Sequence, residues 1–493
     1  MFELLITGFE AALTITNLGF IAAGITLGIV IGVIPGLGSV TAMAVLIPMT
    51  FYMSPLAAIA FLVGVNKGGT SGGAIPAILL NSPGTPESAA SALDGYPMAQ
   101  RGESIRAMKF ALFSSVTGDT ISDLLLIVLV VPFSAIALQF GPLEFTALLI
   151  FAFVLLSGIS AESPIKGLIS ISLGVFLSTI GLDPVESTPR MTFDEVSLYD
   201  GLPLTAVAIG ALALASIVEQ LFDLWRSGGE NSTSIIVYTQ SETKLPAKEF
   251  FSHWKTLGRS TFIGSLVGML PGLGVTLAAF LSYGAARRAS SNPGSFGKGN
   301  PEGIIATEAA NSAVVGSNLI PTIALGIPGN MAAALLLGAF IIHGIVPGPF
   351  MLTMHGDLVY SLFASMILAN GFHLLIGRIG IPIWGLVART PKSIILPPVL
   401  VMCIVGVYLP GQSLFDVGVM LTFAGVGLIM RRTGFSLVCL VIGFLLGEMF
   451  ETSLRQSMLL YKSDFTVILE SPISLIFLCL TIFILFRSAL RSK

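Results

Sequence analysis

Residues 66–86, NKGGTSGGAIPAILLNSPGTP, interrupt a largely apolar chain with a dense run of glycine, proline and small polar residues. Only 10% of the 493 residues are charged, whereas a typical soluble domain has about 25%. Long apolar runs with short polar gaps predict an all-α polytopic membrane protein with roughly 12 or more membrane helices. Lipid cannot hydrogen-bond free backbone, so an irregular segment at membrane depth must be enclosed by protein or line a water-filled cavity. Residues 66–86 are therefore the first candidate for a substrate site.

The glycine and proline pattern occurs twice in the chain. GIVIGVIPGLGSVT at 28–41 matches GSLVGMLPGLGVT at 264–276. Further along, NSAVVGSNLIPTIALGIPGN at 311–330 matches residues 66–86 at a second constant spacing. Two matching blocks in the same order predict an internal duplication, and the change in spacing predicts an insertion within 287–300.

The duplication divides the chain into two repeats, each with a polar hairpin tip. The expected segments are a first repeat at 1–225 with its tip near 81–86, a cytoplasmic linker at 226–258, a second repeat at 259–452 with its tip near 326–330, and an extra C-terminal helix within 453–493.

Basic residues occupy different loops in the two repeats. The cluster at 101–109 follows the first hairpin, whereas the corresponding loop at 344–357 contains no lysine or arginine. Conversely, the basic cluster at 287–298 matches a neutral turn of the first repeat. Cytoplasmic loops collect lysine and arginine, so this alternation predicts inverted-topology repeats with broken helices and re-entrant hairpins. The basic C-terminal residues 487–493 predict a cytoplasmic C-terminus.

Polar side chains of the two blocks are the candidate substrate ligands. Amides and hydroxyls donate to a carboxylate, glycines allow close backbone approach, and broken helices present N–H groups to anions. The Lys67 ammonium either captures a carboxylate or extends to the membrane interface, and a plain solvent turn is the alternative for the tip at 81–86. The candidates are Asn66, Lys67, Gly68, Gly69, Thr70, Ser71, Asn81, Ser82, Pro83, Gly84, Thr85, Asn311, Ser312, Pro328, Gly329 and Asn330. The polar contacts expected among them are Asn66, Ser82, Thr85, Asn311 and Asn330.

The two PGLG breaks have no reactive or hydrogen-bonding side chains, so any role they have comes from their backbone geometry. We interpret them as hinges or close helix contacts, with backbone ion ligands as the alternative. The residues concerned are Pro35, Gly36, Gly38, Pro271, Gly272 and Gly274.

Three acidic residues within apolar runs are candidates for ion coupling. Asp119 and Asp123 are four residues apart and lie on one face of a predicted helix, and Glu308 precedes the second polar block. Acids inside membrane segments mark proton or cation pathways. The alternatives are burial beside a polar cavity without coupling for the aspartates and a helix-surface position for Glu308. Beyond Na⁺ or H⁺, no cofactor or metal is expected.

Enzymatic and nucleic-acid functions find no support in the sequence. GSFGKGN at 294–300 lacks the spacing of a phosphate-binding loop, and no nucleophile elbow or zinc motif stands out. No basic tract indicates nucleic acid as a partner. The three cysteines, Cys403, Cys439 and Cys479, lie in apolar runs and are expected to pack in the core. We therefore predict a protein that is not an enzyme.

The two PGLG copies, with NKGGTSGGAIPAILLNSPGTPESA and EAANSAVVGSNLIPTIALGIPG, resemble the large membrane subunit of the tripartite tricarboxylate transporter family. The resemblance covers about residues 20–450. It implies a multi-pass permease of the bacterial inner membrane that takes up citrate-like di- and tricarboxylates with Na⁺ or H⁺. It also implies two partners, a small four-helix membrane subunit and a periplasmic substrate-binding protein. By analogy with related carriers, an elevator movement of the hairpins is expected.

Two other functions remain open from the residues alone. One is a channel or a non-transporting membrane scaffold, although a channel more naturally has a continuous polar face than two confined polar blocks. The other is a carrier of the same fold for another organic anion or an amino acid.

Overall fold

The computed structural model describes residues 2–34, 36–160, 163–183, 187–226, 245–271, 274–387, 390–461 and 471–491. Nearly all of this is helical, which confirms the predicted all-α class. The described residues contain one small antiparallel sheet, in which β1 (Gly181–Leu182) pairs with β2 (Pro189–Arg190). Two of the hinge candidates, Pro35 and Gly272, lie outside the described residues.

The elements of the first half run from the N-terminus to the linker. They are α1 (Phe2–Ala12), α2 (Ile15–Gly32), α3 (Ser39–Leu46), the 3-10 helix η1 (Ile47–Tyr52), α4 (Pro55–Gly72), α5 (Ala74–Leu80), α6 (Ser88–Gln100), α7 (Ser104–Ala137), α8 (Pro142–Ser160), α9 (Pro164–Ser178), the 3-10 helix η2 (Val196–Leu198), α10 (Leu204–Ala208), the π-helix η3 (Ile209–Leu214) and α11 (Ala215–Arg226).

The elements of the second half follow the linker, most of which lies outside the described residues. They are α12 (Ala247–Ser252), α13 (Trp254–Met269), α14 (Gly274–Ala289), the 3-10 helix η4 (Pro293–Ser295), α15 (Pro301–Ser317), α16 (Leu319–Leu325), α17 (Met331–Ile342), α18 (Met351–Met354), α19 (Gly356–Val387), α20 (Lys392–Gly411), α21 (Leu414–Arg432), α22 (Leu437–Leu460) and α23 (Pro472–Arg491).

The same order of elements occurs twice. A helix before PGLG, a helix after it, a glycine-rich helix, a short helical hairpin and a long helix follow one another as α2 to α7 and again as α13 to α19. Both hairpin tips begin with a left-handed residue, Asn81 at φ 50° and Gly326 at φ 70°. The orientation of one repeat relative to the other across a membrane stays a prediction.

One expectation about the first polar block is wrong. Residues 66–72 do not break the helical pattern, because α4 continues through them to Gly72. The glycines here allow α4 to pack closely against α2 and α3. A Cβ atom on Gly72 would lie 2.8 Å from the Ile29 carbonyl oxygen, and one on Gly69 would lie 2.8 Å from the Ser39 Cα. The hairpin itself spans α5 and α6, with residues 81–87 as its tip.

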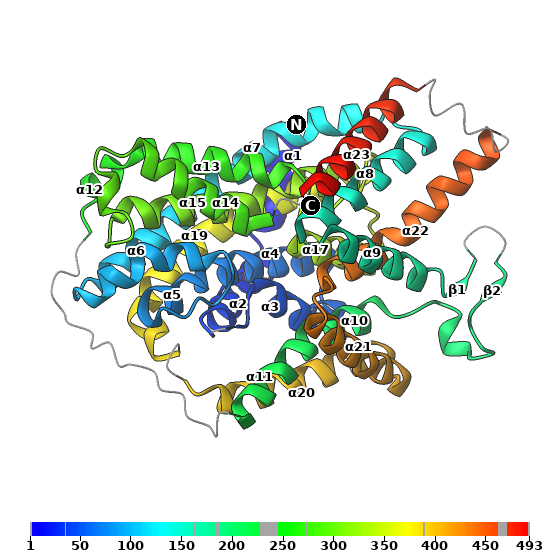
Figure 1. Cartoon of the computed structure of the whole chain (residues 1–493), viewed down its shortest axis with the longest axis horizontal. Coiled ribbons are helices and arrows are strands. Elements are labelled where there is room, and N and C mark those ends of the chain that lie inside the picture. Colours follow the sequence, from blue (N-terminus) through cyan, green and yellow to red (C-terminus); the bar gives the residue numbers. More distant parts are fainter. Residues whose placement is uncertain are drawn as a thin grey trace.

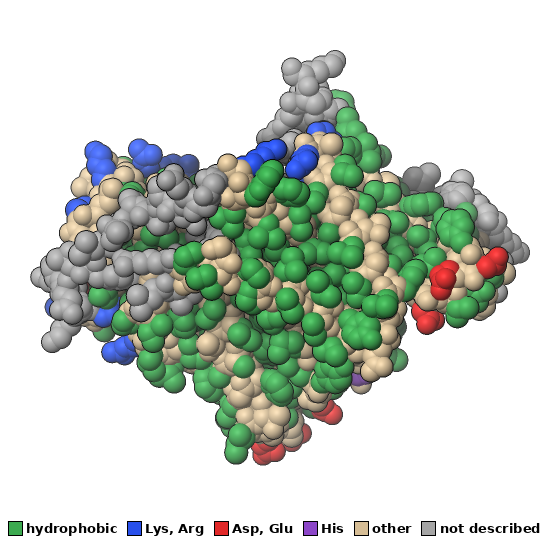
Figure 2. Space-filling model, turned by 90° about the horizontal axis from the view of Figure 1, so that it is seen from below, with side chains coloured by type: hydrophobic (Ala, Val, Ile, Leu, Met, Phe, Trp, Pro, Cys, Tyr) green, Lys and Arg blue, Asp and Glu red, His purple; other side chains and the backbone are tan. Residues whose placement is uncertain are grey.

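Apolar helices long enough for a membrane run throughout the fold. Within the described residues, seven helices are long and apolar enough to cross a membrane, and five shorter apolar helices accompany them. The expected total of roughly a dozen spans is therefore not confirmed. Figure 2 shows lysine and arginine side chains along one edge of the molecule and acidic side chains at the opposite edge and one end. The face between them is mainly hydrophobic, as lipid contact requires.

The two halves interlock rather than forming separate bodies. The helix α22 of the second half packs on α9 of the first, where a Cβ on Gly443 would lie 2.9 Å from the Ile171 Cα. Similarly, α21 of the second half packs on η3 of the first half, where a Cβ on Gly427 would lie 2.8 Å from the Ala211 carbonyl oxygen. Figure 1 shows α8, α9 and α22 toward one end of the molecule and α5, α6, α13 and α15 toward the other.

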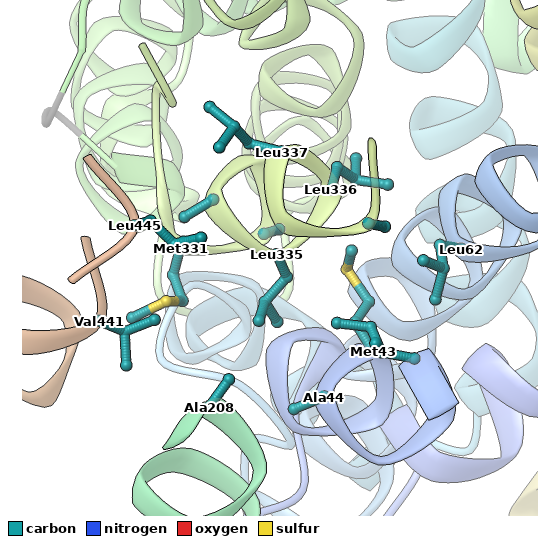
Figure 3. Close-up of a cluster of buried hydrophobic side chains, with 14 of the residues drawn as sticks. Met43, Ala44, Leu62, Ala208, Met331, Leu335, Leu336, Leu337, Val441 and Leu445 are labelled. Atoms are coloured by element: carbon teal, nitrogen blue, oxygen red, sulfur yellow. The ribbon is translucent and has the colours of Figure 1, made fainter. Parts of the chain in front are cut away.

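The main hydrophobic core lies between the halves. Figure 3 shows Leu335 and Leu336 of the second hairpin facing Met43 of α3 and Leu62 of α4, with Met331 beside Val441 of α22. All of these side chains are buried. The second hairpin is thus anchored by apolar contacts to the first repeat on one side and to α22 on the other.

Candidate functional site

A cavity of about 870 Å³ lies where the two repeats meet. One part of its wall comes from the regions after the PGLG breaks and from the hairpin tips, and the other from α8, η3, α11, α21 and α22. Its lining includes Gly36, Gly38, Ser39, Asn66, Thr70, Pro83, Gly84, Thr85, Glu87, Gly274, Asn330, Met331, Arg431, Ser436 and Leu437.

Five helices begin at this cavity. The first residues of α3, α14, α17 and α22 all line it, and so do the residues just before the start of α6. The N-terminus of each helix carries about half a positive charge and presents unpaired N–H groups. The starts of α3 and α6 have the same places in the recurring order of elements as those of α14 and α17. The arrangement creates a favourable electrostatic environment for an anion.

Capping differs among these helix ends. The Asn330 side chain accepts a hydrogen bond from the Ala333 N–H at 2.9 Å, and Ser436 Oγ accepts one from the Cys439 N–H at 3.2 Å. The helices α3 and α6 begin without a side-chain cap. The N–H groups in the first turn of α3 therefore remain available to a ligand, since Ser39, Val40 and Thr41 all line the cavity.

Several predicted substrate ligands line the cavity. Asn66 and Thr70 lie one turn apart on α4 and are both 2% exposed. Pro83, Gly84 and Thr85 of the first tip and Asn330 of the second tip also line it, as do the hinge candidates Gly36, Gly38 and Gly274. Residues of both tips thus line the same cavity.

Other predicted ligands lie away from this cavity. Gly68, Gly69 and Gly329 are packed against neighbouring backbone or Cβ atoms, and Ser71 faces α7 and α19 residues. Asn81 ends α5, and the Ser82 N–H donates to the Pro76 carbonyl oxygen at 3.3 Å. Asn311 and Ser312 are buried within α15. The lining also omits Lys67, Pro328 and the hinge candidate Pro271.

Lys67 belongs to a buried charge cluster. Its Nζ donates to Asp123 Oδ2 and to Asn370 Oδ1, each at 2.7 Å, and lies 3.5 Å from Asp119 Oδ1. Asn370 donates in turn to Asp123 at 2.8 Å, and His373 Nδ1 lies 3.4 Å from Asp119 Oδ2. The lysine does not extend to an interface, because it is fully buried. The cluster joins α4, α7 and α19 through the two aspartates that were predicted as ion-coupling candidates.

Glu308 occupies a second buried polar network. It is fully buried, so the helix-surface alternative is wrong. Its carboxyl group contacts the Ser91 hydroxyl of α6 and the Ser115 hydroxyl of α7, the latter at 3.0 Å. Within the described part of the chain, no group of three or more His, Cys, Asp or Glu residues is placed to hold a metal ion.

Sequence reasoning missed two charged residues of the cavity. Arg431 lines the cavity and pairs with Glu219 at 2.9 Å. Glu87 is the last residue of the first tip, lines the cavity and is 8% exposed. The position next to PGTP was a signal for Glu87, whereas nothing near Arg431 in the sequence linked it to the polar blocks.

Comparison with known proteins gives one consistent family. Across 95% of this chain and 92% of the relative, the chain is 33% identical to an uncharacterised 52.8 kDa protein in the TAR-I ttuC′ 3′ region of Agrobacterium vitis. It is 36% identical, over 43% of this chain and 87% of the relative, to an uncharacterised protein in the TAR-II ttuC′ 3′ region of the same organism. No solved structure matches the chain. The model of the tripartite tricarboxylate transporter TctA family matches residues 18–442. With this match spanning both repeats, the chain belongs to the tripartite tricarboxylate transporter TctA family.

Proposed function

We propose that this chain is the large permease subunit of a binding-protein-dependent system that takes up small di- or tricarboxylates of the citrate type. The observation that carries the proposal is the meeting of five helix N-termini at one cavity of about 870 Å³. Such ends favour multiply charged anions, because each contributes N–H donors and partial positive charge. Arg431, which is paired with Glu219, lies on the same wall and offers further N–H donors.

The polar side chains around the cavity suit carboxylate recognition. Asn66, Thr70 and Thr85 offer an amide and hydroxyls from the first repeat, and Asn330 offers an amide from the second. These groups lie on the hairpin tips and on the helix beside them. A substrate held there contacts both repeats at once, as in carriers built from inverted repeats with sites formed by broken helices.

Uptake in this proposal is secondary and coupled to Na⁺ or H⁺, with an elevator movement of the hairpins. Asp119, Asp123 and Glu308 stay the ion-coupling candidates, since acids buried within membrane segments mark ion pathways. The proposed setting is the bacterial inner membrane with a cytoplasmic C-terminus. The family relationship supports two partners, a periplasmic binding protein that delivers the substrate and a small membrane subunit with four helices.

The test is uptake into proteoliposomes that contain the full chain with its two partner subunits. A panel of mono-, di- and tricarboxylates and their amides is offered with a Na⁺ gradient, a proton gradient or neither. We expect gradient-dependent accumulation of a di- or tricarboxylate and none of the amides. Downhill leak alone, or accumulation of the amides, would contradict a carboxylate carrier.

A single isosteric substitution tests whether the substrate binds in the cavity. Thr70→Val removes one hydroxyl from the lining, and a lost hydrogen bond to a charged group is expected to raise KM about tenfold. The matched control is Thr26→Val, because the Thr26 hydroxyl only donates to the Ala22 carbonyl oxygen in its own helix at 2.8 Å. An equal effect of the two substitutions would remove Thr70 from the site.

A further inference from the structure

Glu308 forms a hydroxyl network that connects three helices. Its carboxyl oxygens contact Ser91 Oγ on the first hairpin and Ser115 Oγ on α7. The preceding residue, Thr307, also contacts Ser91 Oγ, with 2.8 Å between the two oxygens. Thr307 Oγ1 in turn lies 3.0 Å from the Ile304 carbonyl oxygen and 3.1 Å from that of Gly303. The network therefore connects the α6 arm of the first hairpin with α15 of the second repeat.

Counting hydrogens assigns the protonation state of this network. It contains four oxygen–oxygen contacts, namely Ser115 to Glu308, Glu308 to Ser91, Ser91 to Thr307, and Thr307 to a backbone carbonyl. Each hydroxyl supplies one hydrogen, so the three hydroxyls satisfy only three contacts. A proton on Glu308 supplies the fourth: Glu308 donates to Ser91, Ser91 to Thr307, and Thr307 to the carbonyl. With an ionised Glu308, two oxygens face each other without a hydrogen between them.

The charges around Glu308 agree with the neutral form. Glu87, directly before α6, is itself an acid and supplies no opposite charge. On the packed elements α4 and α7, Lys67 is paired with Asp119 and Asp123. On α6, Asp94 accepts hydrogen bonds from Tyr283 and from the backbone N–H groups of Gly297, Gly299 and Asn300.

The cations on the remaining packed helices also have other neighbours. Lys255 lies over the Trp254 ring, Arg259 donates to Thr256, and Arg287 lies in the last turn of α14. Arg288 lies at the C-terminal end of α14, and on α15 itself Glu302 lies 3.4 Å from His253. A fully buried carboxylate with no opposite charge is strongly disfavoured.

We propose that Glu308 is a proton-binding site whose occupancy holds the first hairpin against α15. The proton is taken from water and sits on the oxygen that faces Ser91, and it returns to water when the hairpin moves away. No other bond is made or broken. Docking of the hairpin is therefore favoured at low pH and weakened as pH rises, since loss of the proton leaves a buried anion against Ser91. The assignment of this proton to transport rests on the proposed function, whereas its presence on Glu308 does not.

The first experiment detects the proton without any transport. Infrared difference spectra of the purified full chain at neutral pH compare the wild type with Glu308→Gln. We expect the wild type to show the carbonyl band of a protonated, hydrogen-bonded carboxylic acid and Glu308→Gln to lack it. Glu302→Gln, on the same helix, is the matched control and keeps the band. A band that is identical in wild type and Glu308→Gln overturns the proposal.

A second variant covers the case in which Glu308→Gln does not fold. Ser91→Ala removes the acceptor of the Glu308 proton, so the band is expected to shift to higher frequency while remaining present. An unchanged band position in Ser91→Ala contradicts the assigned contact.

A transport measurement separates proton coupling through Glu308 from carboxylate transport itself. With the same proteoliposomes, Glu308→Gln is expected to keep carboxylate exchange within about twofold and to lose accumulation driven by a proton gradient. If the band disappears but proton-driven accumulation persists, Glu308 carries a proton that does not couple to transport. If the wild type transports no carboxylate, the proposed function fails, and the infrared result on Glu308 stands by itself.

Discussion

Replacing Lys67 with methionine is expected to be among the most destabilising single substitutions in the chain. Within the described residues, the Lys67 ammonium lies beside two carboxylates, those of Asp119 and Asp123, with 2.7 Å to the nearer one. All three side chains are buried. Lys67→Met therefore leaves two acids without their cation, and breaking a buried pair in this way costs about 3–5 kcal/mol.

The charge count predicts an order among related variants. Asp123→Asn is expected to cost less than Lys67→Met, because Lys67 keeps Asp119 at 3.5 Å and the cluster of one ammonium and two carboxylates becomes neutral. Adding Asp123→Asn to Lys67→Met removes one of the two orphaned acids. The double variant is therefore expected to be more stable than the sum of the single effects, by about 1–3 kcal/mol.

Equilibrium unfolding in mixed micelles, followed by circular dichroism, measures these differences. Lys298→Met is the control, because Lys298 is exposed and a surface substitution is expected to change stability by no more than about 0.5 kcal/mol. The reasoning is refuted if Lys67→Met matches this control, or if the effects of Lys67→Met and Asp123→Asn simply add.

Two further predictions concern the hairpin tip and the topology. Gly84→Ala is expected to destabilise the protein by about 1–3 kcal/mol, because its Cβ would meet the Gly32 carbonyl oxygen and lie 2.9 Å from the Gly73 Cα. Gly19→Ala, which meets nothing within 4 Å, should be neutral or stabilising in the same unfolding assay. For the topology, single cysteines at the exposed positions Gln100 and Phe350, in a background without the native cysteines, should react with a membrane-impermeant reagent from opposite sides. Labelling from the same side would end the inverted-repeat interpretation.

The repeat and the helical path were readable from the sequence because they depend on local patterns. The PGLG pair and the two proline-glycine tips fix where each half begins and turns, and apolar runs separate the remaining helices. The glycine-rich segment 66–72 was misread for the same reason. Glycine predicts irregular backbone when it stands alone in a pattern, but here it lets α4 approach α2, which only the tertiary packing reveals.

The charge partners were not readable. Lys67 is 56 residues from Asp123 and 303 from Asn370. No spacing rule connects residues so far apart, whereas Asp119 and Asp123 are recognisable as one helical face. The convergence of five helix starts on one cavity likewise needs the arrangement of both halves. The sequence showed where helices begin but not that their ends face one another.

The two buried networks limit which parts can move in the proposed elevator. The helix α7 contributes Asp119 and Asp123 to the Lys67 cluster and Ser115 to the Glu308 network, so it is tied by buried polar contacts to α4, α15 and α19. Sliding α4 or α19 past α7 would leave buried charges unpaired, and sliding α15 past α7 would leave buried polar groups without partners. Both are costly. The opposite wall of the cavity, from α8, η3 and α22, is largely apolar and lined by residues such as Leu156, Leu212 and Ile442. Apolar contacts exchange without such a penalty, so the boundary of the moving body is expected to run along this wall, with α4, α7, α15 and α19 moving together.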